Sequence, residues 1–157
     1  MLTSLEATLG PDHDRVAHIL AHLARAHILQ GNFAIAGQQL DRAVEILDRT
    51  QGPSFPELSR PLIAQGLLAL ARGRPAEALA PLERTLALVG DGWEPPAEYT
   101  ELRLALAEAL WSAGGDRVRA RALVGEVVER LRDEAASPGR AGWIADAERW
   151  LAGHPEA

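Results

Sequence analysis

Cysteine and lysine are both absent from this chain of 157 residues, so all 16 of its basic residues are arginine. Without cysteine, the chain has no thiolate nucleophile, no disulfide and no sulfur ligand for zinc or iron. Without lysine, it has neither the amine of a Schiff-base enzyme nor the lysine of a phosphate-binding loop. The two absences exclude several large enzyme classes, and the lack of cysteine is consistent with a reducing compartment.

Aromatic residues make up only 4% of the chain, and acidic residues outnumber basic ones, which gives a net charge of −6. Nucleic-acid binding depends on neutralising phosphates with basic side chains, and the one basic cluster, Arg117, Arg119 and Arg121, is spread over a helix surface, so we expect no nucleic-acid partner. No stretch approaches the roughly 20 apolar residues that cross a bilayer. Residues 1–10 lack the basic and apolar regions of a secretion signal. We expect a soluble, cytoplasmic protein that does not bind membranes.

The feature that the chain does have is an internal repeat: Gly31, Gly73 and Gly115 stand 42 residues apart. The same interval relates further sets: Ala36, Ala78 and Ala120; Pro11, Pro53 and Pro95; Leu20, Leu62 and Leu104; Leu40, Leu82 and Val124; Val44, Leu86 and Val128; Leu47, Val89 and Leu131. Self-similarity with a period of roughly 20–50 residues is typical of repeat architectures. We therefore expect one domain, residues 1–157, with repeats at about 11–50, 53–92 and 95–135.

Each repeat has apolar residues at three- and four-residue steps on both sides of its glycine, which predicts two amphipathic helices joined by a tight turn. Glycine suits that turn because it adopts the left-handed conformation that ends a helix. The predicted helices are 12–30, 34–49, 56–72, 75–89, 96–113 and 117–135, followed by a capping helix at 140–152. Residues 2–9 resemble the tail of a preceding second helix, which makes a longer parent chain plausible.

Acidic residues and histidines gather at the start of the first repeat, where Asp12, His13, Asp14, His18 and His22 follow a turn. Asp14, His18 and His22 are spaced at four-residue steps and could present neighbouring ligands to a metal. Eight residues of helix rise about 12 Å, however, whereas zinc holds its ligands at roughly 2.0–2.2 Å. All three cannot share one ion, and these residues do not recur 42 residues later, so we expect no metal and no cofactor.

Catalytic patterns are also missing from the sequence. Glu98 and Glu101 could serve as paired acids in principle, but no nucleophile or glycine-rich phosphate loop accompanies them. Acidic residues near a helix start interact favourably with the helix dipole, which accounts for them without catalysis. We therefore expect that the chain is not an enzyme.

The repeats resemble tetratricopeptide repeats in the 42-residue form found in kinesin light chains. The segments that carry the resemblance are "LGPDHDRVAHILAHLARAHILQGNFAIAGQQLDRAVEIL", "GPSFPELSRPLIAQGLLALARGRPAEALAPLERTLALV" and "ELRLALAEALWSAGGDRVRARALVGEVVERL". The small residue near the end of each first helix is Ala24 and then Gly66, whereas Glu108 stands there in the third unit. Together with the tail "AERWLAGHP", the third unit also resembles the C-terminal repeat regions of myxobacterial serine/threonine kinases. The resemblance implies an all-α fold: a right-handed superhelix of three helix hairpins plus a C-terminal capping helix.

In that family the first helices of successive repeats line a concave groove that holds a peptide or a helix. Placed by the 42-residue register, the groove would contain His18, Ala21, His22 and Arg25, then Arg60, Ile63 and Leu67, then Leu102, Ala105 and Ala109. Residues of this kind form a largely apolar groove, which favours the apolar side of an amphipathic helix or a second copy of the chain. Trp93 lies in the loop "GDGWEPP", and it either folds over the seam between repeats or contacts a partner.

The sequence as a whole predicts a non-catalytic scaffold that binds a protein or peptide partner. Two alternatives stay open. One is a sensory or oligomerising tail of a bacterial signalling kinase or regulator, which would make the chain a homo-oligomer. The other is a small helical protein that binds a metal or another ligand through His18 and His22.

Overall fold

The structure is a computed structural model that describes residues 2–90, 96–133 and 140–155. Within these ranges the chain forms eight α-helices and one short 3-10 helix, with no β-strand. The elements are α1 (Leu2–Leu9), α2 (Asp14–Leu29), α3 (Phe33–Gln51), η1 (Pro56–Leu58), α4 (Ser59–Ala71), α5 (Pro75–Val89), α6 (Pro96–Ser112), α7 (Arg117–Asp133) and α8 (Arg140–Gly153). The predicted all-α class is confirmed, and each predicted helix is present with ends within about three residues of those expected.

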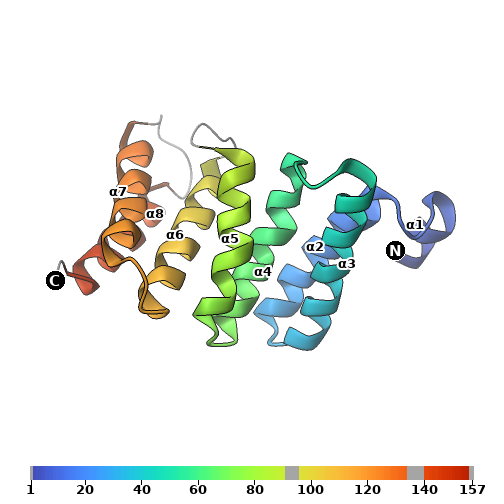
Figure 1. Ribbon diagram of the computed structural model, residues 1–157, viewed down its shortest axis with the longest axis horizontal. Helices are drawn as coiled ribbons and strands as arrows, with labels where there is room; N and C mark the ends of the chain where they lie inside the picture. Colours follow the sequence, from blue (N-terminus) through green and yellow to red (C-terminus); the bar gives the residue numbers. More distant parts are fainter. Residues whose placement is uncertain (1, 91–95, 134–139, 156–157) are drawn as a thin grey trace.

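The helices pack in consecutive pairs, α2 with α3, α4 with α5, and α6 with α7. The three hairpins stand side by side in a row, with α2, α4 and α6 in one layer and α3, α5 and α7 in the other (Figure 1). Between neighbouring hairpins, α4 contacts α2 and α3 on one side, and α6 contacts α4 and α5 on the other. This stack of similar hairpins is the arrangement that the 42-residue repeat predicts.

Each hairpin turns at a glycine with a positive φ, which closes the first helix in a left-handed cap. Gly31 has a φ of 78° and Gly73 a φ of 70°. In both turns the next residue donates its backbone N–H to a carbonyl five residues earlier, Asn32 to His27 at 2.8 Å and Arg74 to Ala69 at 2.9 Å. The first two hairpins therefore end their first helices in the same way.

The third hairpin departs from this register by one residue. Its left-handed glycine is Gly114, with a φ of 72°, and it is Gly115 that donates its N–H to the Leu110 carbonyl at 2.8 Å. The expected equivalence of Gly115 with Gly31 and Gly73 is therefore wrong. The turn contains one extra residue, Asp116, whose carboxylate accepts the Arg119 N–H at 2.9 Å at the start of α7.

This offset moves every side chain of α6 by one position relative to α2 and α4. The small-residue column continues as Ala24, Gly66 and Ala107, all buried, so Glu108 does not interrupt it. Arg103 takes the core place of Leu20 and Leu62, with only 1% of its surface exposed. Its Nε contacts the Glu126 carboxylate at 3.1 Å, and its guanidinium lies 3.7 Å from the centre of the Tyr99 ring. Leu104, which the 42-residue interval aligns with Leu20, is only partly buried.

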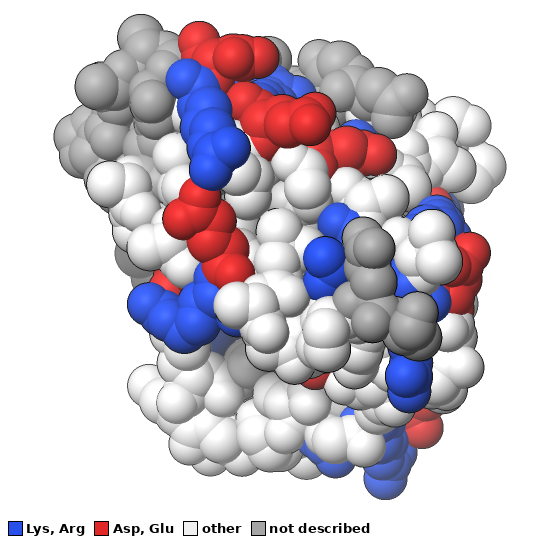
Figure 2. Space-filling model, turned by 90° about the vertical axis from the view of Figure 1, so that its left-hand side faces the viewer, with Lys and Arg blue, Asp and Glu red and all other residues white. Residues whose placement is uncertain are grey.

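The last helix, α8, packs on α7 through the apolar stripe predicted for it. Ala147 is fully buried, and Trp143, Ile144, Trp150 and Leu151 pack partly buried against the core that α4 to α7 form. At the outer face of this end, acidic and basic side chains lie beside one another (Figure 2). An ion pair joins α7 to α8, in which Nη2 of Arg132 lies 2.5 Å from the Glu148 carboxylate. Among the described residues, no helix combines the length and apolar character needed to cross a bilayer.

Candidate interaction groove

The first helices of the hairpins line a hollow of about 750 Å³, hereafter called the groove. Its walls come from α2, α4 and α6, and Trp143 of α8 also lines it. The volume is within the roughly 300–1,000 Å³ that is typical of ligand-binding pockets. The sequence predicted a binding surface on the first helices of the hairpins. These helices do enclose a hollow.

Most of the predicted binding residues line this groove: His18, Ala21, His22, Arg25, Arg60, Ile63, Leu67 and Ala105. Leu102 and Ala109 do not, because both are fully buried in the core. Their expected place in the groove is therefore corrected. Trp93 falls outside the residues that the structure describes.

The one-residue offset of α6 explains the two corrected positions. The groove contains Glu101, Leu104 and Glu108, and two of them immediately precede Leu102 and Ala109. A strict 42-residue interval could not find them. The sequence indicates this ambiguity through the adjacent glycines at 114 and 115, because either of them could end the helix. Which of the two does so sets the register of α6.

The floor of the groove is apolar. Ala21 comes from α2, Ile63 and Leu67 from α4, and Leu104 from α6. Ile63 is 1% exposed and fixed in the core, whereas Leu67 is only partly buried and faces the hollow. This floor can bury apolar side chains of a ligand, with a driving force of roughly 25 cal/mol for each Å² removed from water.

One charged pair spans the groove from the first hairpin to the third. Arg25 of α2 donates two hydrogen bonds to the Glu101 carboxylate of α6, at 2.9 and 2.6 Å. The bonds to Glu101 raise the pKa of Arg25 above its ordinary value, although burial opposes this. Paired hydrogen bonds between a guanidinium and a carboxylate are the strong, geometrically specific form of this interaction. The pair therefore links α2 of the first hairpin directly to α6 of the third.

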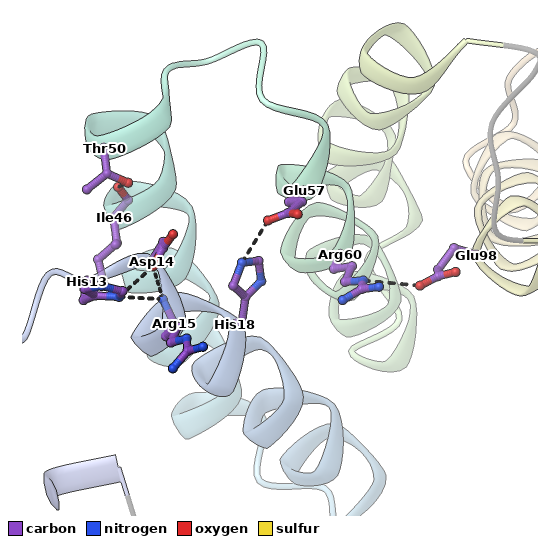
Figure 3. A network of polar contacts seen from close by, with 9 residues as sticks. All are labelled: His13, Asp14, Arg15, His18, Ile46, Thr50, Glu57, Arg60 and Glu98. Atoms are coloured by element: carbon purple, nitrogen blue, oxygen red, sulfur yellow. Dashed lines mark hydrogen bonds and ion pairs between the residues drawn. The ribbon is translucent and has the colours of Figure 1, made fainter. Parts of the chain in front are cut away.

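Two further pairs hold groove residues in place (Figure 3). Nε of Arg60 on α4 lies 3.3 Å from the Glu98 carboxylate on α6, and Nε2 of His18 on α2 lies 3.0 Å from the Glu57 carboxylate of η1. Each pair joins neighbouring parts of the row. Histidine carries a charge only when protonated, so Arg60 and Glu98 form the permanent ion pair of the two.

The acidic residues and histidines at the start of α2 do not form one cluster but make contacts in two separate places. His13 is the N-cap of α2, where its Nδ1 accepts the Arg15 N–H at 3.2 Å, and Asp14 lies 2.6 Å from it (Figure 3). His18 instead points to Glu57, away from His13. In the part of the chain that the structure describes, no group of three or more His, Asp or Glu side chains could hold a metal ion.

Both the sequence and the fold of this chain are similar to those of known repeat proteins. Residues 16–89, just under half of the chain, match the tetratricopeptide repeat family. In structure the chain resembles BtubC (BKLC) from P. vanneervenii, with a TM-score of 0.71 and 22% sequence identity. The chain has the tetratricopeptide repeat fold. The similarity covers 87% of this chain and 56% of BtubC, so the chain corresponds to little more than half of that protein. No curated protein matches the sequence.

Tetratricopeptide repeats are generally protein-interaction modules and are typically non-catalytic. In this chain the family match covers α2 to α5, so the two hairpins that carry His18, Arg25, Arg60 and Leu67 lie within it. The third hairpin, with its offset α6, lies outside the matched residues. The groove of this tetratricopeptide fold is therefore formed by α2 and α4, which lie within the family match, and by α6, which lies outside it and contributes three glutamates.

Glu108 joins this tetratricopeptide groove to the capping helix. Its carboxylate accepts the Ser112 hydroxyl at 2.6 Å and the Trp150 indole N–H at 2.8 Å. These hydrogen bonds lower the pKa of Glu108 below its ordinary value. Trp150 also meets Trp111 edge to face at 5.7 Å between ring centres and stacks on His154 at 4.0 Å. Glu108, which lines the groove, is thus hydrogen-bonded to a cluster of packed aromatic rings.

Proposed function

We propose that this chain is a non-catalytic scaffold that binds a peptide or helix of a partner protein in the groove. The observation that carries the proposal is the apolar floor at Ile63, Leu67 and Leu104, enclosed between walls of charged side chains. An amphipathic helix or a short segment can place its apolar side on such a floor while its polar side stays in water. The tetratricopeptide fold, generally an interaction module, supports the same conclusion.

Leu67 is the residue best suited to test this proposal, because it faces the hollow and a carboxylate there would be left unpaired in an apolar contact. The experiment selects short peptides from a random library on the wild-type protein and then measures their affinity by calorimetry. We expect Leu67→Glu to abolish binding while the helical circular-dichroism signal stays intact.

Val118 offers a matched control for the same chemical change. It lies at the start of α7, is 81% exposed, and is not among the residues that line the groove. We expect Val118→Glu to bind the selected peptides with wild-type affinity. Equal binding by wild type and Leu67→Glu would count against the groove as the docking site.

The same two variants separate partner binding from self-association. If the groove served to hold a second copy of the chain, light scattering would find a dimer for wild type and for Val118→Glu, and a monomer for Leu67→Glu. A monomer in all three proteins, together with loss of peptide binding in Leu67→Glu alone, supports a separate partner.

A further inference from the structure

We infer that the partner segment of the groove carries acidic side chains at one end, large apolar side chains in the middle and basic side chains at the other end. This inference rests on the proposed function and specifies the chemistry of the ligand. It comes from the way in which charge is divided between the helices that line the groove.

The two sides of the groove carry opposite charges. Arg25 and Arg60 come from α2 and α4, whereas Glu98, Glu101 and Glu108 all come from α6. His18 and His22 of α2 line the same part of the groove as Arg25. The acidic side depends on the one-residue offset of α6, because that offset brings Glu101 and Glu108 into the groove and places Leu102 and Ala109 in the core.

Within the groove the two sides neutralise each other. Arg25 binds Glu101 through both of its terminal nitrogens, and Arg60 contacts Glu98 at 3.3 Å. Glu98 and Glu101 are more buried than their partners, with side-chain exposures of 22% and 30%. A ligand that enters between the sides must therefore separate charges that are partly withdrawn from water.

This geometry selects against a ligand with charge of a single sign. An acidic segment would bind the two arginines but leave the glutamates of α6 without their partners, and a basic segment would do the reverse. Separating a pair without replacing it costs the desolvation of the charge left behind. A segment that carries both signs at separate ends replaces every pair that it breaks, so its net cost is smallest.

The test uses helical peptides that share the same apolar stripe and the same chemical staple on the solvent side, so that helix content is equal. One peptide has glutamates at one end and lysines at the other, a second has the same residues in alternation, and two more carry glutamate or lysine throughout. We expect the segregated peptide to bind about tenfold more tightly than each of the others, which corresponds to about 1.4 kcal/mol.

The double variant Arg25→Glu with Glu101→Arg provides a control on the protein side. It keeps an ion pair across the groove and the net charge, but each side then carries both signs. We expect the preference for the segregated peptide to fall to about twofold in this variant while the thermal unfolding temperature stays close to that of wild type.

The outcomes are distinct from those for the proposed function. Equal affinity for all four peptides, lost in Leu67→Glu, would uphold the groove and overturn the charge order. A tenfold preference that survives the double variant would also overturn it, because the preference would then not come from these residues. If none of the four peptides binds, the stated chemistry is wrong, whereas the groove itself is judged by the library peptides.

Discussion

Leu82 of α5 lies directly against the backbone of Gly66 in α4: a Cβ atom on residue 66 would be 2.5 Å from the Leu82 Cγ. Non-bonded carbon atoms do not approach so closely, so the α4–α5 hairpin depends on the absence of a side chain at this position. The small-residue column of the repeat therefore has a steric cause in the second hairpin.

Replacing Gly66 by alanine is expected to destabilise the protein by about 1 kcal/mol. Alanine favours a helix over glycine by about 1 kcal/mol, but forcing a methyl group into a packed core costs roughly 1–3 kcal/mol. Gly125 in α7 is the matched control, since no atom outside the neighbouring backbone of its own helix lies within 4 Å of the position that a Cβ would take there. Gly125→Ala should stabilise by up to about 1 kcal/mol. Urea unfolding measures both, and stabilisation by Gly66→Ala would contradict the packing.

The one-residue offset of α6 makes a second prediction, at the adjacent glycines. Gly114 has a positive φ of 72°, so Gly114→Ala should cost about 1–2 kcal/mol, the penalty for a side chain in the left-handed region. Gly115 occupies the place of Asn32 and Arg74, so Gly115→Asn should cost clearly less, although a Cβ there would lie 3.1 Å from the Leu110 carbonyl. Thermal unfolding compares the two variants, and a larger loss at 115 would restore the strict 42-residue register.

The lowered pKa of Glu108 predicts that the free energy of unfolding depends on pH. Its pKa is lowered in the folded protein from an ordinary 4.5, chiefly by the hydrogen bonds from Ser112 and Trp150. A lowered pKa means that the carboxylate stabilises the fold above pH 4.5, and that this contribution is lost as the pH falls below 4.5 and through the folded-state value. The difference in unfolding free energy between wild type and Glu108→Gln should thus be present at neutral pH and disappear in strong acid. A difference that persists unchanged in strong acid would rule out this role.

Two ion pairs repeat along the outer layer of helices: Arg84 of α5 with Asp48 of α3, and Arg119 of α7 with Glu83 of α5, both at 2.5 Å. All four side chains are between 34% and 40% exposed, so water and salt weaken the pairs. We expect a double-mutant cycle on Arg119 and Glu83 to give a coupling of about 0.5 kcal/mol at low salt and almost none in concentrated sodium chloride. A coupling that is independent of salt would contradict this.

The sequence was sufficient for the helices and insufficient for the register of one of them. Apolar periodicity and the glycines at 31 and 73 predict the first two hairpins correctly, because each of these turns contains a single glycine, and that glycine adopts the left-handed conformation. At 114 and 115 two neighbours can do so, and the choice depends on tertiary packing, in which Arg103 is buried against Tyr99 and Glu126. That choice decides whether Glu101 or Leu102 faces the groove, so the acidic side could not be derived from the repeat interval.

The sequence also did not predict Trp143 as a residue that lines the groove. Its helical stripe predicts contact with the preceding hairpin, and the structure confirms this contact. The stripe does not tell that the side chain also lines the hollow, as it does in the structure. The place of Trp143 beside the hollow depends on the packing of α8 against its neighbours, which includes the hydrogen bond from Trp150 to Glu108.

The hairpins of this protein pack chiefly on their neighbours along the row, and this has a consequence for how the chain loses its structure. Unfolding does not need to be all-or-none, since an end unit can detach while the central ones persist. Amide hydrogens should exchange fastest in α1 and α8 and slowest in α4, which is held on both sides. A ligand that spans α2, α4 and α6 would then tie the units together and slow exchange in all of them at once.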